Sequence, residues 1–415
     1  MSPPSHIAYY ISSHGYGHAT RAIQLCHSLL RAYDGLEITV VSQASSQIFL
    51  PLLNSSKRVN LRPVHVDSAV IQPTPYLLDV EQTVSNLLQL DTNEIISTEA
   101  EWLSTHNIDL VLVDAPYLPC IAASQAKIMS ILITNFSFAE VFSYFHDMVG
   151  QKAQEKLDAA VEEAVKGYSH ADVWLRLPGW LPNPGFLPIQ LPSSTWVSEE
   201  VLHATVDGEI SPEYSIANPK YKRKVIDTPL ITRPATTTPR SDLLKMLEIP
   251  PEFFTFKILL LLLPLPDPPP QIPSDWVCVV AGSTPTMLLP DRYFVAPGDI
   301  HIPDVMKISS CVMAKLGYGT VSEVLGADVP LVYIPRCQFI EEYGLRNLVE
   351  TWPGYGDRAE RLEIEFFEKG YWWWLVTDVA CREKTDAEAG PVDDGEAIRR
   401  LVVDEWTAWK RSIDL

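Results

Sequence analysis

The stretch that decides the fold is Ile7–Ser42, IAYYISSHGYGHATRAIQLCHSLLRAYDGLEITVVS. It opens with one apolar run, Ile7–Ile11, and closes with another, Leu36–Ser42. Between these runs, apolar residues recur at helical spacing from Ala22 to Leu30, which predicts a helix. Strand, helix and strand in this order form a βαβ unit. Continuous apolar strands are typical of a parallel sheet that is buried on both faces, so the stretch predicts a doubly wound α/β domain.

The same alternation continues along the chain and predicts a second domain. A Pro/Ser/Asn-rich stretch without periodicity separates the two halves and is predicted to be a linker or an elaborated loop (Pro182–Pro219). The further predicted strands are Asp109–Ala115, Ile128–Phe136, Asp172–Gly179, Lys224–Arg233, Lys257–Leu265, Trp276–Gly282, Cys311–Gly317 and Pro330–Pro335. The further predicted helices are Cys120–Lys127, Ser241–Ile249, Thr320–Ala327 and Glu396–Lys410, and Ala139–Tyr168 is predicted to be a helix-rich stretch. We therefore expect an α/β protein with two Rossmann-like doubly wound domains, residues 1–215 and 222–395, followed by a C-terminal helix, 396–415.

Composition bounds the class of protein. The chain has 415 residues, of which 47% are hydrophobic and 20% charged, as in ordinary globular domains. Its formal net charge of −20 would repel a phosphate backbone, so no nucleic-acid partner is expected. The six cysteines are scattered singly, as in a reducing compartment. The N-terminus lacks the pattern of a signal peptide, and the longest apolar run, Ile258–Leu263, is too short for a transmembrane segment, so a cytoplasmic location is expected.

The loop Ser13–His18, SHGYGH, lies between a predicted strand and the N-terminus of a predicted helix. Ligands of open α/β sheets bind beyond the carboxyl ends of the strands, and free helix N–H groups favour an anion there. His18 is a candidate general base, since the pKa of histidine lies near working pH, and Asp114 at the end of another strand is the candidate that orients it. The alternative is that the glycine turn and the aspartate only cap helices.

A second glycine loop, Lys315–Glu323, KLGYGTVSE, lies between a strand and a helix of the second half. The candidate ligand groups here are the backbone opened by Gly317 and Gly319, the Thr320 hydroxyl and N–H for phosphate, and the Glu323 carboxylate for ribose hydroxyls. The loop lacks the spaced GK[ST] of a Walker A motif.

Two acidic residues follow the next strand, and they are candidates for binding sugar hydroxyls. Glu341 and Glu342 could equally favour a helix dipole at a solvated helix start.

No metal site is expected, because the sequence has no HExxH motif and no DxD cluster at a strand end. The acidic pair Asp393 and Asp394 is predicted to lie in a surface loop.

Several long motifs resemble the glycosyltransferase-like N-terminal half of plant L-arabinokinases and related stand-alone proteins. They are YYISSHGYGHATR, DLVLVDAPYLPCIAA, ITNFSF, YSHADVWLRLPG, VIDTPLITR and KLGYGTVSEVLGADVPLVYIPR, and they span nearly the whole chain in order. The resemblance implies the GT-B fold, in which two Rossmann-like domains face a cleft. It implies an acceptor-binding first domain and a nucleotide-sugar-binding second domain.

The resemblance also implies inverting, metal-independent transfer from a nucleotide sugar, with UDP as the expected nucleotide, to a hydroxyl on a small molecule or glycan. The nucleotide sugar is then a co-substrate and no cofactor is needed. His18 and Asp114 stand where such enzymes carry their catalytic dyad, and Glu323 stands where relatives hold the donor ribose. On the acceptor side we place His14, Gly15, Gly17 and Asn135.

The chain departs from these relatives at two places. Where they carry a Gly-Gly-rich loop after the first strand of the second domain, this chain reads LPLPDPPPQIP, Leu263–Pro273, which predicts a stiff loop. It also has no Gly-rich kinase loop, so arabinokinase activity is not implied. Two alternatives to the glycosyltransferase therefore remain: a sugar-nucleotide epimerase or hydrolase of the same fold, and a non-catalytic binder or regulator.

Overall fold

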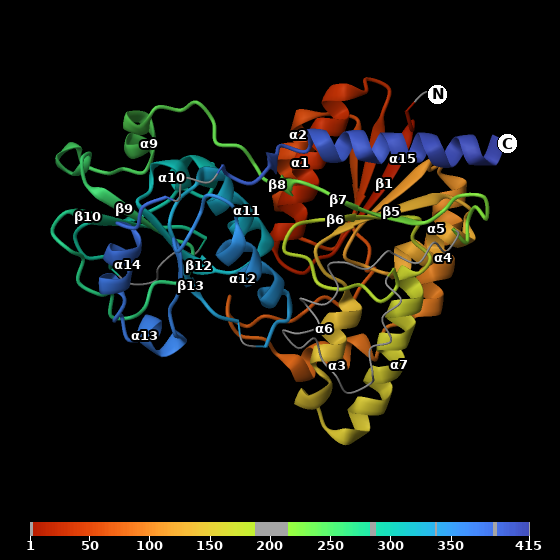
Figure 1. Ribbon diagram of the computed structural model, residues 1–415, viewed down its shortest axis with the longest axis horizontal. Coiled ribbons are helices and arrows are strands. Elements are labelled where there is room, and N and C mark those ends of the chain that lie inside the picture. The colour runs from red at the N-terminus through yellow and green to blue at the C-terminus, as the bar shows by residue number, and fades with distance from the viewer. Residues whose placement is uncertain (1–2, 187–214, 283–287, 337, 385–387, 415) are drawn as a thin grey trace.

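The computed structural model describes residues 3–186, 215–282, 288–336, 338–384 and 388–414. It forms two α/β domains that lie side by side (Figure 1). The first contains a seven-stranded parallel sheet in the order β3-β2-β1-β4-β5-β6-β7, and the second a six-stranded parallel sheet in the order β11-β10-β9-β12-β13-β14. This confirms the predicted fold class.

The bounds of the elements are as follows. The strands of the first sheet are β1 (His6–Ile11), β2 (Glu37–Val41), β3 (Val59–Arg62), β4 (Leu110–Asp114), β5 (Met129–Thr134), β6 (Val173–Arg176) and β7 (Lys224–Asp227). Those of the second are β9 (Lys257–Leu261), β10 (Trp276–Val280), β11 (Tyr293–Val295), β12 (Cys311–Lys315), β13 (Leu331–Ile334) and β14 (Ala359–Arg361). The first half carries α1 (Tyr16–Ala32), α2 (Ser46–Ser55), α3 (Val80–Leu87), α4 (Thr92–Thr105), α5 (Leu118–Gln125), α6 (Phe138–Tyr144), η1 (His146–Met148) and α7 (Gln151–Tyr168). The second carries α9 (Arg240–Met246), η2 (Pro251–Phe253), α10 (Ile302–Ile308), α11 (Tyr318–Ala327), α12 (Glu341–Thr351), α13 (Ile364–Glu368) and α14 (Trp373–Val379), and α15 (Glu396–Asp414) ends the chain.

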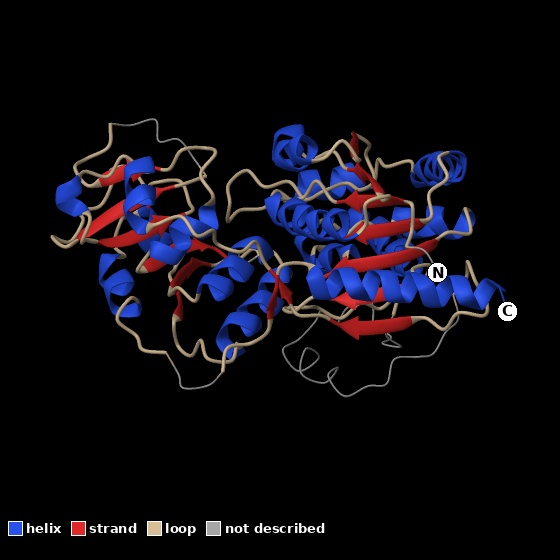
Figure 2. Ribbon diagram, turned by 90° about the horizontal axis from the view of Figure 1, so that it is seen from above, coloured by secondary structure: helices blue, strands red, loops and turns tan. Residues whose placement is uncertain are grey.

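The first sheet is buried on both faces, as its continuous apolar strands predict. Along β1, Ile7, Tyr9 and Ile11 pack into one apolar core, while Ala8 and Tyr10 pack into another. Because successive side chains of a strand point to opposite faces, the two cores lie on opposite sides of the sheet. Figure 2 shows helices on both sides of this sheet. Burial on both faces leaves the strand ends as the accessible edge for a ligand.

The order of the strands indicates where a ligand would bind each sheet. In each sheet the chain order reverses between two neighbouring central strands, β1 and β4 in the first sheet and β9 and β12 in the second. Loops that leave the carboxyl ends of such a pair diverge to opposite faces and leave a crevice between them, which is where ligands of open α/β sheets bind. Both glycine loops follow a strand of such a pair.

The connection between the domains differs from the prediction. The single strand expected over Lys224–Arg233 is two short strands: β7 pairs with β6 at the edge of the first sheet, and β8 (Leu230–Ile231) pairs with β15 (Val392–Asp393). The sequence break at Thr228-Pro229 accounts for this, since proline cannot donate a ladder hydrogen bond. The first sheet therefore takes up residues that we had expected in the 222–395 domain.

The last helix returns to the first domain. Ile398, Val402, Trp406 and Trp409 recur at helical spacing and pack into a core that also contains residues of α1. In Figure 1, α15 lies across the first domain. Asp393, expected in a surface loop, instead lies in β15 and accepts hydrogen bonds from the first backbone N–H groups of α15. The C-terminal helix was predicted correctly, and its docking site was not predicted.

Other differences are local. The helix-rich stretch predicted over Ala139–Tyr168 contains α6, η1 and α7, with a break before Gly150, whose backbone is extended. The core of the predicted linker Pro182–Pro219 lies outside the described residues. Residues 43–108 had no predicted elements, and they form α2, β3, α3 and α4.

Candidate active site between the two sheets

The two glycine loops meet. Helix α1 begins just after Gly15, whose φ of 73° lies in the left-handed region that favours glycine. Helix α11 begins just after Gly317, and α1 packs against α11. The contact is closest at Gly17 and Gly319, where a Cβ on Gly17 would lie 3.3 Å from the Gly319 nitrogen. Glycine at both positions lets the N-terminal ends of two helices approach, and helix N-termini attract anions.

The two residues predicted to form a dyad are in contact. His18, in the first turn of α1, and Asp114, the last residue of β4, are both buried, and His18 Nδ1 lies 2.8 Å from Asp114 Oδ1. If Nδ1 donates this bond, Nε2 is left as the basic atom. Ala115, directly after Asp114, has φ of 82°, which is strained for a residue other than glycine and is found mainly at functional sites.

Arg21 is a member of this cluster that the sequence analysis did not assign. Its guanidinium is buried and donates to both oxygens of Asp114, with Nε 2.6 Å from Oδ2 and Nη2 2.5 Å from Oδ1. Nη2 also lies 2.9 Å from His18 Nδ1, because both donors converge on the same oxygen. Burial raises the pKa of the Asp114 carboxyl, but Arg21 and His18 lower it, so that it stays below its ordinary value. Arg21 follows His18 by three residues, and this helical spacing on one face was the available signal.

Asn135, which was placed on the acceptor side, forms hydrogen bonds to side chains of both domains. Its side chain is fully buried; Oδ1 accepts from Arg21 Nη1 at 2.8 Å, and Nδ2 donates to Glu341 Oε1 at 3.2 Å. Arg336, which follows β13, donates in turn from Nη2 to Glu341 Oε2 at 3.2 Å and from its backbone N–H to Glu342 Oε2 at 2.6 Å. The two glutamates predicted to bind sugar hydroxyls are therefore held within a buried network that links the domains.

His14 lies beside this cluster. Its ring is buried 6.1 Å from that of His18 and 5.0 Å from that of Phe339, and Nδ1 lies 3.3 Å from the Val70 carbonyl. Burial lowers the pKa of His14 well below its ordinary value, and neighbouring cations lower it further. A neutral His14 can hydrogen-bond an acceptor substrate without adding charge, which is compatible with its predicted side of the cleft.

Lys315, the last residue of β12, was quoted in the second glycine motif but had no predicted role. Its ammonium lies 3.5 Å from Gln72 Oε1 on the first domain. Burial lowers the pKa of Lys315 to about 7, and Arg336 contributes to the lowering. Lys315 is thus a buried lysine with a lowered pKa that lies where the two domains touch.

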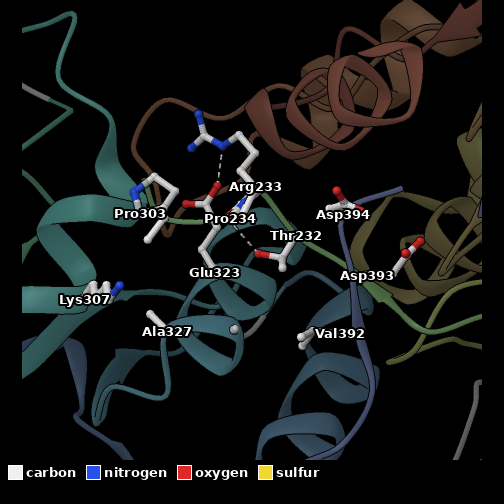
Figure 3. A pocket seen from close by; sticks show the side chains of 12 residues that line it. Thr232, Arg233, Pro234, Pro303, Lys307, Glu323, Ala327, Val392, Asp393 and Asp394 are labelled. Atoms are coloured by element: carbon white, nitrogen blue, oxygen red, sulfur yellow. Dashed lines mark hydrogen bonds and ion pairs between the residues drawn. The ribbon is translucent and has the colours of Figure 1, made fainter. Parts of the chain in front are cut away.

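Glu323 lines a separate pocket with a volume of about 510 Å³. The pocket lies where α10 and α11 face the two chain crossings between the domains, and Figure 3 shows Arg233 reaching from one crossing to Glu323. Arg233 Nε donates to Glu323 Oε1 at 2.5 Å. Thr320, half-buried in the first turn of α11, lies one turn before Glu323 on the same helix. Thr320 and Glu323, which were predicted to bind phosphate and ribose, therefore lie on one helix.

Among the described residues, no group of three or more His, Cys, Asp or Glu side chains could hold a metal ion. Likewise, no helix in the described part of the chain is long and apolar enough to cross a membrane.

Comparison with known proteins defines the class of fold. The chain has a GT-B glycosyltransferase-like fold. A UDP-glucosyltransferase from Polygonum tinctorium aligns with a TM-score of 0.56 over 99% of this chain and 94% of its own, at 13% identity. A Listeria monocytogenes structure that carries the name of a UDP-N-acetylglucosamine 2-epimerase aligns with a TM-score of 0.51 at 11% identity, over 98% and 97% of the two chains. The Staphylococcus aureus protein MnaA, solved with UDP, aligns with a TM-score of 0.53 at 12% identity, over 99% and 98%. At these identities the likeness shows the fold alone.

A more specific similarity is to L-arabinokinase from Arabidopsis thaliana. The two sequences are 29% identical over 353 residues, which is 83% of this chain. The aligned part spans 29% of the length of L-arabinokinase. No family model matches the chain.

Proposed function

We propose that this protein is an inverting, metal-independent glycosyltransferase that moves a sugar from a nucleotide donor, with UDP the expected nucleotide, to a hydroxyl of an acceptor. The observation that carries the proposal is the buried 2.8 Å contact between His18 and Asp114, beside the point where Gly17 and Gly319 meet. A base and an anion-binding helix end are thus adjacent. This is the pair of elements that a single displacement on a sugar diphosphate requires.

In this reaction the acceptor hydroxyl oxygen attacks the anomeric carbon, the bond from that carbon to the diphosphate oxygen breaks, and the configuration inverts. His18 Nε2 takes the hydroxyl proton, and Asp114 holds the imidazole through Nδ1. Such a base contributes about 10²–10⁴-fold to the rate. The leaving diphosphate binds the N-terminal end of α11 at Gly319 and Thr320, with Gly317 opening the loop.

The remaining proposed contacts divide the substrates between the domains. Glu323 would hold the donor ribose, and Glu341 and Glu342 would hold the transferred sugar. On the other side of the cleft His14, with the Gly15 and Gly17 backbone, would line the acceptor. Asn135 keeps the two halves in register through Arg21 and Glu341. Lys315 adds a cation at the second strand end, on the donor side.

A second candidate, a non-catalytic sugar-nucleotide binder or regulator, is favoured by two observations. Arg21 already neutralises Asp114, which lessens the stabilisation that the carboxylate can give to a charged His18. The Pro-rich segment Leu263–Pro273 is also fixed in place, because Tyr293 donates to the Pro270 carbonyl at 2.6 Å and Arg292 to the Ile272 carbonyl at 2.9 Å. An epimerase or hydrolase has fold-level support only.

The first experiment is a thermal-shift screen with UDP-, GDP- and dTDP-sugars. A ligand at 100 times its Kd adds about 2.7 kcal/mol of stability, which raises the melting temperature measurably. Donor hydrolysis and transfer to an acceptor panel are then followed in the wild type and in His18→Ala. Transfer that falls at least a hundredfold in His18→Ala, with donor binding retained, supports the transferase.

Other outcomes separate the candidates. Nucleotide-sugar binding without any turnover supports the binder, and a freed or epimerised sugar without acceptor supports the epimerase or hydrolase. Full transfer activity in His18→Ala would exclude His18 as the base. No binding of any nucleotide sugar would reject a functional donor site.

A further inference from the structure

A small pocket lies at the carboxyl ends of β13 and β14 in the second domain, and we call it the arginine pocket. It has a volume of about 110 Å³ and is lined by Pro335, Arg336, Glu342, Tyr343, Arg346 and Arg361. The first two of these follow β13, the last one ends β14, and the other three belong to the first two turns of α12. Pockets for drug-sized ligands measure about 300–1,000 Å³, so this one suits a single small group and not a whole nucleotide.

Positive charge dominates the lining of the arginine pocket, although the chain as a whole is acidic. Three of its six lining residues are arginines and one is a glutamate, in a chain with 32 basic and 52 acidic residues. The pocket also lies at the N-terminal end of α12, and helix N-termini favour anions. Because the arginine fork matches the geometry of carboxylate and phosphate groups, the expected occupant is a small anion.

The buried arginine of the pocket has an unused donor. The Arg336 side chain is 1% exposed, and its Nε has no hydrogen-bond partner. Glu342 Oε2 lies 3.6 Å from this nitrogen, too far for a hydrogen bond, and accepts from the Arg336 backbone N–H at 2.6 Å. Burial raises the pKa of Glu342, although all three arginines oppose this electrostatically. The one carboxylate that lines the pocket therefore leaves the Arg336 guanidinium incompletely paired.

The other two arginines are accessible to a ligand, since their side chains are 31% exposed in Arg346 and 42% exposed in Arg361. Each lies near an exposed glutamate: Arg346 Nε is 3.9 Å from Glu350 Oε1, and Arg361 Nε is 2.9 Å from Glu363 Oε1. These pairs are the opposing consideration, because they give the arginines a structural use. Exposed ion pairs contribute little to stability, however, so a ligand carboxylate can compete with them.

The order of the strands relates the arginine pocket to the proposed donor site. In the second sheet β13 lies between β12 and β14. The loop after β12 leads to Gly319 and Thr320, where the diphosphate is proposed to bind, and the pocket lies on the other side, at the ends of β13 and β14. Glu342 lines the pocket and is also a proposed contact of the transferred sugar. A sugar bound there would extend from the diphosphate toward the three arginines.

We infer that the arginine pocket binds a carboxylate of the transferred sugar, so that the donor is a nucleoside diphosphate uronic acid. The inference rests on the proposed transferase function, since it names the class of donor for the same reaction. The carboxylate takes no part in the transfer, and the bonds that form and break at the anomeric carbon are unchanged. A neutral hexose would place an uncharged hydroxymethyl group against the guanidinium groups, which would exclude water from them without pairing their charge.

The test is isothermal titration calorimetry of the full chain with matched pairs of UDP sugars. UDP-glucuronic acid is compared with UDP-glucose, and UDP-galacturonic acid with UDP-galactose, so that only the carboxylate differs within each pair. We expect at least one uronic acid to bind about tenfold or more tightly than its neutral partner, because hydrogen bonds to charged groups are the stronger ones. The net charge of −20 would by itself disfavour the more anionic ligand, so this preference would be a property of the pocket.

Arg346→Gln and Arg361→Gln test whether the preference arises in the pocket. Both side chains are partly exposed, so the variants should fold, which thermal unfolding checks. In each, the ratio of the neutral to the uronic acid Kd should fall by about three- to tenfold. Arg382→Gln is the matched control, because Arg382 also pairs with two carboxylates of the second domain, Glu360 and Asp378, but is not a lining residue of the pocket. It removes the same charge and should keep the wild-type ratio.

Three results would overturn the inference. The first is an equal Kd for the uronic acid and its neutral partner in both pairs; titration with inorganic phosphate would then show whether the pocket takes another small anion. The second is a preference that keeps its wild-type ratio in both arginine variants, and the third is the absence of binding from all four UDP sugars. The first two results leave the proposed function standing, because a donor still binds. After the third, the GDP and dTDP arms of the thermal-shift screen decide whether the proposed function falls as well.

Discussion

Replacing Arg21 with methionine should strongly destabilise the first domain. Methionine keeps an apolar side chain of similar length but loses the guanidinium, whose central carbon lies 4.5 Å from the centre of the Tyr318 ring. It removes the two bonds to Asp114, of 2.5 and 2.6 Å, and the bond of 2.8 Å to Asn135. Asp114 is then a fully buried carboxylate with His18 as its remaining side-chain partner. Breaking a buried pair in this way costs about 3–5 kcal/mol.

The assay is urea unfolding of the wild type, Arg21→Met, Asp114→Asn and the double variant. Removal of both charges leaves no unpaired ion, so the double variant should be less destabilised than the sum of the single variants, with a coupling energy of about 1–3 kcal/mol. Arg31→Met is the control on the same helix, because the Arg31 side chain is 60% exposed and only 3.5 Å from Asp394 in a surface pair. Its effect should stay within about 0.5 kcal/mol.

The pH dependence of stability tests the Arg21–Asp114 contact independently. The pKa of Asp114 is lowered in the folded state, so its contribution to stability is present above the unfolded value of about 3.9 and is lost as pH falls through the folded value. Without Arg21, the loss should begin at a higher pH. A cost below about 1 kcal/mol for Arg21→Met, or strict additivity in the double variant, would refute the account of Arg21 as the partner that stabilises a buried Asp114.

Three further predictions concern single positions. Burial raises the pKa of Glu140 to about 8 from its ordinary 4.5, so stability should fall as pH rises between these values; Glu140→Gln should remove the fall in urea unfolding, and an unchanged pH profile would contradict it. Lys315 has its pKa lowered to about 7, so UDP binding that uses this cation should weaken as pH rises through 7 in calorimetric titrations; Lys315→Met should abolish the pH dependence. A Cβ at residue 319 would lie 3.3 Å from the Gly17 Cα, so Gly319→Ala should cost about 1–3 kcal/mol in thermal unfolding, whereas Gly35→Ala, with open space around it, should not; equal effects would show that the close approach is absent.

Periodicity and strand-end position were sufficient to predict much of this molecule. The apolar runs at Ile7–Ile11 and Asp109–Ala115 identified two strands that pair as neighbours, β1 and β4. Because parallel strands end at the same edge, the prediction that His18 and Asp114 lie close together followed from their positions alone. Helical spacing puts Arg21 on the same face as His18, but the sequence could not show that both side chains share the Asp114 carboxylate. Arg21 looked like an ordinary polar residue of an amphipathic helix until the fold placed it over Asp114.

Other features were beyond sequence reasoning because they depend on contacts between distant segments. Asn135 and Glu341 are separated by 206 positions, and no local pattern indicates that they form a hydrogen bond. The boundary between the sheets was misjudged because Lys224–Arg233 resembles one strand, while Pro229 divides it between two sheets.

The two glycine loops acquire a joint explanation in the structure. Each was interpreted separately as an opening for backbone to approach a ligand, but Gly17 and Gly319 also approach one another. Two helix N-termini then meet where the domains touch, and the side chains of Lys315 and Arg336 act electrostatically on His14 beside them. Arg336 contacts Glu341 and Glu342, and Arg21 contacts Asp114, so the negative charge of these carboxylates is balanced inside the protein. The partial positive charge at the two helix N-termini is not balanced by these carboxylates. A diphosphate bound between the two domains would interact favourably with both helix ends. This supports a nucleotide-sugar donor over a neutral ligand at this point.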